Sequence, residues 1–543
     1  MSDKSATLEN GLVRIDFPYD PRIVSDLKER FENAVFDRTK KCWYIDPDSV
    51  PTNALYLFFK KWYIIPESNL VDKIEDERNR RKRMLVKSMQ TRASKDIDFP
   101  HPAGLSFFPF QEACIEFIIR NHGNVLVADE CGLGKTIEVL GYARKVIHLP
   151  MLVVCPVVAK VNWHYESMRW LEIPENKIRI IGQGFAQPTV ENLEGKKVII
   201  TNYELVEKYL SIFDELPIKL LVVDECQYLK NYKSKRSKAI VALSKGIDDA
   251  LCLSGTPLTN KPIELFPILQ VLKRDKGDFS FWNFTKKYCD AKKKWVPAKG
   301  GGKEIYDTSG ASNLDDLNEK LRKNVMIRRY ASDVYKELPP MHRMMVRIDL
   351  GEKIYRKFKS VEEDFINYYE QTKGKILDKG KKLVFIETMR KLSAKGKIDQ
   401  SLEFIDNLYQ GVSKVIVFAH HQEVLDAVEQ AFKDKTTVLR IDGETPHKIR
   451  ERNIDTFNAL DDVILVASIT ASGTAINLQT CSNVVFIEVT WVPADHQQAE
   501  ARVHRIGQKN ISNIYYLIAD KTIEERIFDV IDKKDRIVKK VLK

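Results

Sequence analysis

The stretch ADECGLGKT, residues 128–136, restricts the fold of this chain more than any other feature. It follows the apolar run NVLVA and precedes the helical pattern IEVLGYARKVI, and strand, glycine-containing turn and helix are the setting of a phosphate-binding loop. Gly132 and Gly134 allow backbone N–H groups to close on phosphates at the helix N-terminus. Lys135 can reach the β- and γ-phosphates, and the Thr136 hydroxyl can ligate Mg²⁺. The stretch therefore predicts a nucleotide site.

The stretch departs from the phosphate-loop pattern at one position, because Asp129 stands where the first glycine is expected. Aspartate tolerates turn geometry and can hydrogen-bond its own backbone. We therefore expect a working loop, provided that the carboxylate of Asp129 points away from the phosphates.

Short apolar runs alternate with helical patterns through most of the chain. The first series is NVLVA, MLVVC, KVIIT, KLLVVD and DALCLS, and the second is KVIVFA, TVLRID, DVILVA, NVVFIE and NIYYLIA. Apolar runs of this kind are typical of parallel strands that are buried on both faces. The chain is therefore predicted to be an α/β protein with two tandem parallel-sheet lobes and helices on both faces of each sheet.

The N-terminal segment has a different pattern. VRIDF alternates as a half-buried strand does, PRIVSDLKERFENAV has the spacing of an amphipathic helix that begins at Pro21, and KKCWYIDPD favours a second strand. Trp43 and Tyr44 alternate across that strand, so we expect one ring to pack on the helix and the other to face out. An exposed ring beside Lys40 and Lys41 could stack on an unpaired base. In the alternative, Trp43 closes the core of the unit.

These patterns divide the chain into five segments. They are an N-terminal α+β unit at 1–65, a charged linker at 66–104, a first lobe at 105–270, a helical insertion at 271–340 and a second lobe at 341–543 with a helical insertion near 352–393. The charged stretch EDERNRRKRMLVK in the linker is expected to be a solvated helix or connection.

Composition limits the classes of partner. The eight cysteines form no C-x-x-C pair, so zinc is not expected. No apolar run approaches the roughly 18–20 residues of a membrane span, so we expect a soluble intracellular chain without a membrane partner. The formal net charge of +11 favours an anionic partner, and nucleic acid phosphates are the main candidate.

An acidic pair follows the apolar run KLLVV. Asp224 and Glu225 are predicted at the carboxyl end of a strand, where ligands of open parallel sheets bind. Behind a phosphate loop, Asp224 suits coordination of Mg²⁺, and Glu225 suits positioning and deprotonating an attacking water. The pair thus favours hydrolysis of a nucleotide over a simple helix cap.

Two arginines in the second lobe could complete such a site. Arg502 and Arg505 lie three apart in QQAEARVHRIGQ, which predicts that they share one face of a helix. Two guanidiniums on one face could reach a γ-phosphate held by the first lobe, as arginine fingers do. A surface salt-bridge face is the alternative.

In this order the motifs resemble those of the Swi/Snf-type ATPases of helicase superfamily two, from about residue 105 to 530. FFPFQ looks like the glutamine motif that reads adenine, and ADECGLGKT resembles the family's own phosphate loop, in which Asp-Glu replaces the usual glycine. LVVCPVVAKVNWHYESMRW and IITNYE are similar to motifs that track DNA, and CLSGTPLTN is similar to the motif that couples the lobes. SITASGTAINL and WVPADHQQAEARVHRIGQ resemble the last two motifs. The resemblance implies two RecA-like lobes.

The resemblance also implies roles for single residues. It implies catalysis by Lys135, Glu225, Arg502 and Arg505, with Thr136 and Asp224 at the metal. It implies nucleotide binding by Gln111, Asp129, Glu130, Cys131, Gly132, Leu133, Gly134, Lys135, Thr136 and Gly473. It implies coupling of the lobes by Gln227, Ser254, Gly255, Thr256 and Gln498. The chain departs from the family in having Gln227 for His, Ala475 for Gly and Val492 for Asn, which puts the efficiency of coupling in doubt. Gln227 can still hydrogen-bond across to the SGT motif.

A narrower resemblance concerns one branch of the family. FTKKYCDAKK, SGASNLDDLNEKL, VMIRRYASDVYKELPP and VIVFAHHQEVLD look like the annealing helicases, and the N-terminal unit resembles their HARP (HepA-related protein) domain. This implies a monomeric double-stranded-DNA translocase that uses ATP and Mg²⁺ to remodel or reanneal branched DNA through sequence-independent phosphate contacts. A strand-separating helicase and a non-catalytic DNA-binding scaffold are the alternatives. We expect a cytoplasmic protein of a bacterial, archaeal or viral system, or a nuclear one if the source is eukaryotic.

Overall fold

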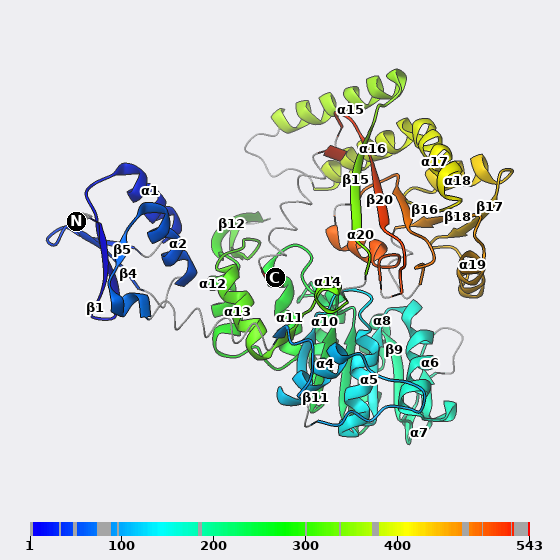
Figure 1. Ribbon diagram of the computed structural model, residues 1–543, viewed down its shortest axis with the longest axis horizontal. Coiled ribbons are helices and arrows are strands. Elements are labelled where there is room, and N and C mark those ends of the chain that lie inside the picture. Colours follow the sequence, from blue (N-terminus) through cyan, green and yellow to red (C-terminus); the bar gives the residue numbers. More distant parts are fainter. Residues whose placement is uncertain are drawn as a thin grey trace.

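The computed structural model contains an N-terminal unit and two lobes, each built on its own sheet (Figure 1). The structure describes residues 4–31, 34–46, 52–72, 88–94, 97–182, 187–298, 301–335, 338–371, 379–469, 477–490, 492–505, 507–522, 524–525 and 541–542. The charged stretch at 75–87 lies outside the described residues.

The described part of the N-terminal unit contains a five-stranded sheet and the helices that pack with it. Its strands in spatial order are β3 (Val35–Asp37), β4 (Cys42–Ile45), β2 (Leu12–Asp16), β1 (Ser5–Glu9) and β5 (Ile65–Pro66), and its helices are α1 (Pro21–Arg30) and α2 (Thr52–Trp62). The helix predicted to begin at Pro21 is confirmed, and the carboxylate of Asp20 accepts from Arg22 N at 2.9 Å as its cap. The unit continues beyond residue 65, because Leu70 lies in its core.

The two aromatic residues of β4 lie on opposite faces of the strand. Trp43 is 8% exposed and lies in the core of the unit, with Lys28 Nζ 5.7 Å from its ring. The Tyr44 hydroxyl donates to Glu9 Oε2 at 2.7 Å and lies 3.2 Å from Lys40 Nζ. Trp43 therefore closes the core, as one of the two alternatives had it, whereas Tyr44 points to the opposite face of the strand and is half-buried there beside Glu9 and Lys40.

The first lobe is built on a seven-stranded parallel sheet. Its strands in spatial order are β14 (Met326–Ile327), β6 (Asn124–Val127), β11 (Asp249–Leu253), β10 (Leu220–Asp224), β7 (Met151–Cys155), β9 (Val198–Asn202) and β8 (Ile178–Ile180). One face is covered by α4 (Pro109–Arg120), α5 (Lys135–Val146) and α6 (Lys160–Leu171). The other is covered by α8 (Tyr203–Lys208), α9 (Leu210–Asp214), α10 (Lys235–Ser244) and α11 (Phe266–Val271).

Two separate apolar clusters explain why these strands read as continuous apolar runs. Leu152 and Val154 of β7 face the cluster of α8 to α11, whereas Met151, Val153 and Cys155 face the cluster of α4 to α6. Successive side chains of a strand point to opposite faces, so a strand covered on both sides needs apolar residues at every position.

The segment expected as a helical insertion, 271–340, is only partly helical. It contains the helices α12 (Phe281–Tyr288), α13 (Leu314–Asn324) and α14 (Ala331–Val334), and also a hairpin of β12 (Lys292–Ala298) and β13 (Gly301–Asp307). Strand β14 then pairs with β6, so the segment returns to the first sheet at its end. The expectation was therefore incomplete: it missed the hairpin as well as β14, and a two-residue strand is too short to show any periodicity.

The second lobe is a six-stranded parallel sheet. Its strands in spatial order are β15 (Met341–Ile348), β20 (Ser512–Ala519), β19 (Asn483–Phe486), β16 (Lys414–Ala419), β18 (Val463–Ser468) and β17 (Thr437–Ile441). Its helices are α15 (Glu352–Gln371), α16 (Lys379–Gly396), α17 (Ile398–Val412), α18 (Gln422–Phe432), α19 (His447–Ala459) and α20 (Pro493–Glu500). The predicted class, an α/β protein with two tandem RecA-like sheets, is confirmed.

The C-terminal residues return to the first lobe. Val541 and Leu542 are buried in its core, the amide of Asn318 donates to Val541 O at 2.6 Å, and Arg322 Nη2 donates to Leu542 O at 2.6 Å. Arg322 is fully buried, and its Nη1 also lies 3.0 Å from Ser88 Oγ. These contacts therefore hold the C-terminal residues, the insertion and the segment before α4 together.

Within the described ranges, no helix is long and apolar enough to cross a membrane.

Candidate nucleotide site

The phosphate loop connects β6 to α5, as the sequence predicts. Gly132 has a φ of +92° and Gly134 a φ of +87°, and this left-handed region is open to glycine without strain. Lys135 is the first residue of α5, and its Nζ donates to the main-chain oxygens of Asp129 at 2.9 Å and Glu130 at 3.3 Å. The loop thus places an ammonium group and the N-terminus of a twelve-residue helix at one point.

The carboxylate of Asp129 is engaged inside the lobe, on a side chain that is fully buried. It accepts from the main-chain N of Arg329 at 2.9 Å, from Arg329 Nε at 3.1 Å and from Arg329 Nη2. Burial opposes its ionisation, but the guanidinium lowers the pKa of Asp129, so the pair is charged. The side chain therefore serves the fold of the loop, and only its main-chain oxygen contacts Lys135.

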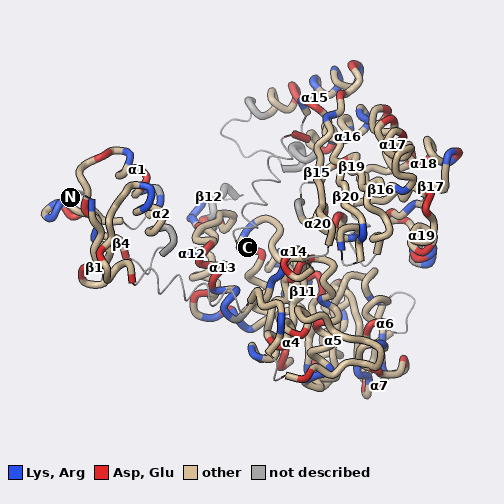
Figure 2. Tube along the Cα trace, viewed as in Figure 1, with Lys and Arg blue, Asp and Glu red and all other residues tan. Residues whose placement is uncertain are grey.

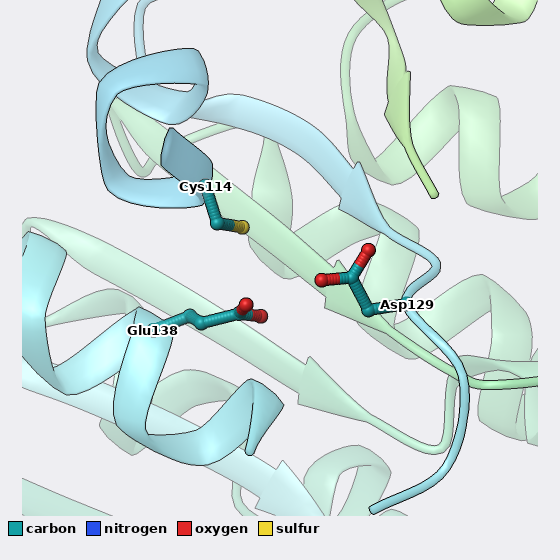
Figure 3. Close-up of side chains that lie close together, drawn as sticks. All are labelled: Cys114, Asp129 and Glu138. Atoms are coloured by element: carbon teal, nitrogen blue, oxygen red, sulfur yellow. The ribbon is translucent and has the colours of Figure 1, made fainter. Parts of the chain in front are cut away.

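Cys114, Asp129 and Glu138 form the one group with metal-ligand chemistry found in the described part of the chain, and their side chains point toward one another (Figure 3). Arg329 already supplies a cation here, because its Nη2 donates to Asp129 and, at 2.9 Å, to Glu138 Oε1. Burial and the neighbouring Asp129 raise the pKa of Glu138 well above its ordinary value, and burial also raises that of the Cys114 thiol. Two neutral groups beside a buried guanidinium do not suit a metal ion.

The acidic pair lies at the end of β10. Asp224 accepts from the indole N–H of Trp163 at 2.8 Å and from Glu225 N at 3.0 Å, and the Tyr203 hydroxyl donates to Asp224 O at 2.5 Å. Burial and the adjacent Glu225 raise the pKa of Asp224 to about 6. Glu225 has a φ of 54°, a conformation that is strained for a residue other than glycine and is found at functional sites.

The carboxylate of Glu225 connects the two lobes. It accepts from Gln227 Nε2 at 2.7 Å, and Nε2 of Gln498, on α20 of the second lobe, lies 3.5 Å from the same Oε2. The described hydrogen bond of Gln227 therefore goes to Glu225 rather than to the SGT motif. Among the described residues, Gln227 Oε1 and Thr256 Oγ1 are both buried without a hydrogen-bond partner, so an acceptor and a hydroxyl donor are still available at the SGT motif.

The SGT motif packs directly on the phosphate loop. Thr256 N donates to Ser254 Oγ at 2.9 Å. A Cβ at Gly255 would overlap the Sγ of Cys131, so this close approach requires glycine. Arg328 fixes the contact, because its Nη1 donates to Gly255 O at 2.9 Å and to Ala128 O at 2.7 Å.

The two arginines follow α20 rather than lie within it, since the helix ends at Glu500. The expectation that they share a helix face is wrong in this respect, although the chain continues in turns, with Arg502 N donating to Ala499 O at 3.1 Å. Arg505 packs on the phosphate loop, because a Cβ on Gly132 would lie 3.1 Å from the Cβ of Arg505. Burial, and then the charge of Arg502, lower the pKa of Arg505. The second lobe thus places a guanidinium residue against the loop.

Gln111 supports the loop through its amide. Its Oε1 accepts from Phe108 N at 3.0 Å and its Nε2 donates to Leu133 O at 3.1 Å. The residue implied to read adenine is therefore also a brace between α4 and the phosphate loop. Thr136 lies in the first turn of α5, and Glu130 Oε2 accepts from Ala331 N at 2.7 Å. Gly473 and Ala475 lie outside the described residues.

Arg328 and Arg329 also contact the nucleotide site, although the sequence motifs did not indicate them. They come immediately after β14, which places one guanidinium on the SGT motif and the other on Asp129. The signal in the sequence was an arginine pair directly after the apolar run VMI.

The two parallel sheets, with a phosphate loop in the first and Gln498 and Arg505 of the second set against its site, define a protein with two RecA-like lobes. The chain belongs to the SNF2-related family. The family model of the SNF2-related domain matches residues 60–408, and that of the helicase conserved C-terminal domain matches residues 396–507. Most of the N-terminal unit lies before the first match, which begins within α2.

Relatives with curated names agree with this family. The DNA annealing helicase and endonuclease ZRANB3 of Mus musculus is 30% identical over 462 residues, which cover 83% of this chain and 42% of the relative. The SWI/SNF-related matrix-associated actin-dependent regulator of chromatin subfamily A-like protein 1 of Xenopus tropicalis is 33% identical over 446 residues, which cover 80% of this chain and 45% of the relative. The chain thus spans less than half the length of these two relatives. The Sulfolobus solfataricus SWI2/SNF2 ATPase core in complex with dsDNA is 23% identical with a TM-score of 0.39, and the match covers 82% of this chain and 96% of that one.

Proposed function

We propose that this chain is an ATP-dependent translocase on double-stranded DNA that remodels or reanneals branched DNA. The observation that carries the proposal is the meeting of the lobes at the phosphate loop, where Gln498 approaches Glu225 and Arg505 packs on Gly132. A site completed by residues from two lobes links nucleotide hydrolysis to their relative movement. Membership of the SNF2-related family and the names of the relatives support DNA as the track.

The residues of the site fit ATP and Mg²⁺. The left-handed glycines and the N-terminus of α5 suit the phosphates, with Lys135 as counter-charge. Thr136 and Asp224 would hold Mg²⁺, a hard cation that prefers oxygen ligands and supplies charge stabilisation at the phosphates. Glu225, which follows Asp224 in the chain, would orient and deprotonate a water, while Arg505 would stabilise negative charge on the transferred phosphoryl group.

DNA binding is proposed through the phosphate backbone. The chain has 87 Lys and Arg against 76 Asp and Glu, and this excess favours sequence-independent and salt-sensitive binding. The phosphates position such a protein on a duplex without reading bases, as a translocase requires.

The proposal is tested by ATP turnover with and without a blunt duplex, on one preparation that is also given an annealing and an unwinding substrate. We expect duplex to stimulate turnover and ATP to drive annealing of a bubble coated by a single-strand binding protein. Net unwinding without annealing would instead favour a strand-separating helicase. No ATP turnover at all, by a folded protein, would favour a DNA-binding scaffold.

The HARP-like unit is proposed to sense DNA structure. Because it has an apolar core of its own, it can be removed as a whole. The shortened chain should keep Ser88, because Ser88 Oγ donates to Met326 O at 2.9 Å and Ser88 O accepts from Arg328 N at 3.2 Å. A chain that starts at Arg80 should therefore keep duplex-stimulated ATPase activity and lose fork remodelling. Equal loss of both activities would make the unit a structural part of the motor, and loss of neither would make it dispensable.

A further inference from the structure

The hairpin β12–β13 places aromatic and basic side chains on one face. Its register sets Lys293 opposite Tyr306 and Trp295 opposite Glu304. Residues directly opposite each other in an antiparallel pair share a face, and positions two apart in a strand do so too. Lys293, Trp295, Glu304 and Tyr306 therefore form one face of the hairpin.

A second tryptophan extends this face from the neighbouring helix. Trp282 of α12 lies with its ring centroid 5.3 Å from that of Tyr306, in an edge-on arrangement with an interplanar angle of 70°. All three rings are exposed to solvent: the exposed fraction is 62% for Trp282, 66% for Trp295 and 47% for Tyr306. We call Trp282, Trp295 and Tyr306 the aromatic platform.

The platform has a rigid base. Phe284 and Tyr288, on the opposite side of α12, are fully buried in the core of the first lobe. The Tyr288 hydroxyl donates to Asp316 Oδ2 of α13 at 2.5 Å. The exposed rings are therefore carried by a fixed helix and a paired hairpin, and holding them in place costs little further conformational entropy when a ligand binds.

The charge around the platform is basic. Residues 281–307 contain seven lysines and three acidic residues. Lys286 is exposed one turn after Trp282, and Lys293 lies on the platform's own face, where Glu304 Oε2 is 3.2 Å from its Nζ. In Figure 2, basic (blue) and acidic (red) stretches of the trace both occur around α12 and β12, and Figure 1 shows β12 apart from α5.

We propose that the aromatic platform binds unpaired nucleotides, with bases stacked on Trp282 and Trp295 and the phosphates beside the lysines. Exposed rings within a basic surface are the combination that binds single strands without sequence preference. An intact duplex hides its base faces and offers mainly phosphates to such a surface. A protein partner is disfavoured, because lysines are depleted from the cores of protein interfaces. The inference rests on the proposed function, since it gives the motor a site for the unpaired part of branched DNA.

The test uses the full chain and its variant Trp282→Ala/Trp295→Ala, with a fluorescent oligo(dT) as probe. Removal of both rings should weaken oligo(dT) binding by roughly 10-fold or more, as expected for lost stacking. Turnover stimulated by blunt duplex should stay near the wild-type value, because neither ring is near the phosphate loop. The matched control Trp282→Phe/Trp295→Phe keeps two aromatic faces and should retain most of the affinity.

A second readout separates stacking from charge. Oligo(dT) should quench the tryptophan fluorescence of the wild type, and most of that quenching should disappear in the alanine variant. Unchanged oligo(dT) affinity after removal of both rings would overturn the proposal. A wild type without duplex-stimulated turnover but with ring-dependent oligo(dT) binding would contradict the proposed motor and leave the platform standing.

Discussion

Replacing Asp129 by glycine would complete the common phosphate-loop pattern, yet the structure predicts that it destabilises the first lobe. The carboxylate of Asp129 is the main charge partner of Arg329, and both side chains are fully buried. Asp129→Gly therefore leaves a guanidinium without its partner in a site that water does not reach. It also removes the acceptor of the Arg329 main-chain N–H.

The expected cost lies at the lower end of what breaking a buried ion pair costs, about 3 kcal/mol of unfolding free energy. It is at the lower end because Glu138 still contacts Arg329 and can ionise once Asp129 is absent. For a domain of this size, that loss lowers the unfolding temperature by roughly 6–12 °C.

Thermal unfolding followed by circular dichroism, together with urea unfolding, measures this cost on the full chain. Glu138→Gln is the matched control, because the raised pKa of Glu138 makes it the neutral partner of the pair, and a glutamine oxygen can still accept from Arg329. We expect the control to lose less than about 1 kcal/mol. The double variant Asp129→Gly/Arg329→Met should lose less than its single variants add up to. Unfolding of Asp129→Gly at the wild-type temperature or above would refute this account of the loop.

Three further predictions concern the motor and the second lobe. Lys135→Ala and Glu225→Gln should each abolish ATP turnover without loss of fold, and Glu225→Gln should still bind a fluorescent ATP analogue. Turnover near the wild-type rate in either variant would contradict the assignment of these residues to the nucleotide site. Arg505→Ala should lower turnover by about 10³-fold with thermal stability little changed, and normal hydrolysis would mean that the lobes do not complete the site together. His421 Nδ1 lies 2.5 Å from Glu488 Oε1, and this hydrogen bond raises the pKa of His421 above its ordinary 6.5. The pair therefore stabilises the second lobe fully below pH 6.5, and the stabilisation is lost as the pH rises through the raised pKa. His421→Gln should then cost more stability in urea unfolding at pH 6 than at pH 9, and an equal cost at both would contradict the pairing.

Most of the fold and part of the nucleotide site could be predicted from local sequence patterns. The phosphate loop is a continuous segment in which Gly132, Gly134 and Lys135 act within a few residues of one another, so spacing alone located it. The two parallel sheets followed from the same logic, because a strand covered on both faces must be apolar throughout. The start of α1 at Pro21 could be predicted because proline suits the first turn of a helix.

The remainder depends on contacts between distant residues. Asp129 and Arg329 are 200 positions apart, and nothing near Asp129 indicates that its carboxylate turns inward. Alternation placed Trp43 and Tyr44 on opposite faces, but which face is covered depends on α1 and on Glu9. The family pattern suggested a bond from Gln227 to the SGT motif, and only the fold shows that Glu225 accepts from its amide.

The most direct test of the motor is displacement of a third strand from a triplex-bearing duplex, in which no duplex strands need to separate. With ATP, the wild type should displace the third strand at a rate that rises with ATP concentration, and Lys135→Ala should displace none above the spontaneous rate. Duplex-stimulated ATP turnover by the wild type without any displacement would contradict translocation, and displacement by Lys135→Ala would contradict a motor driven from this phosphate loop.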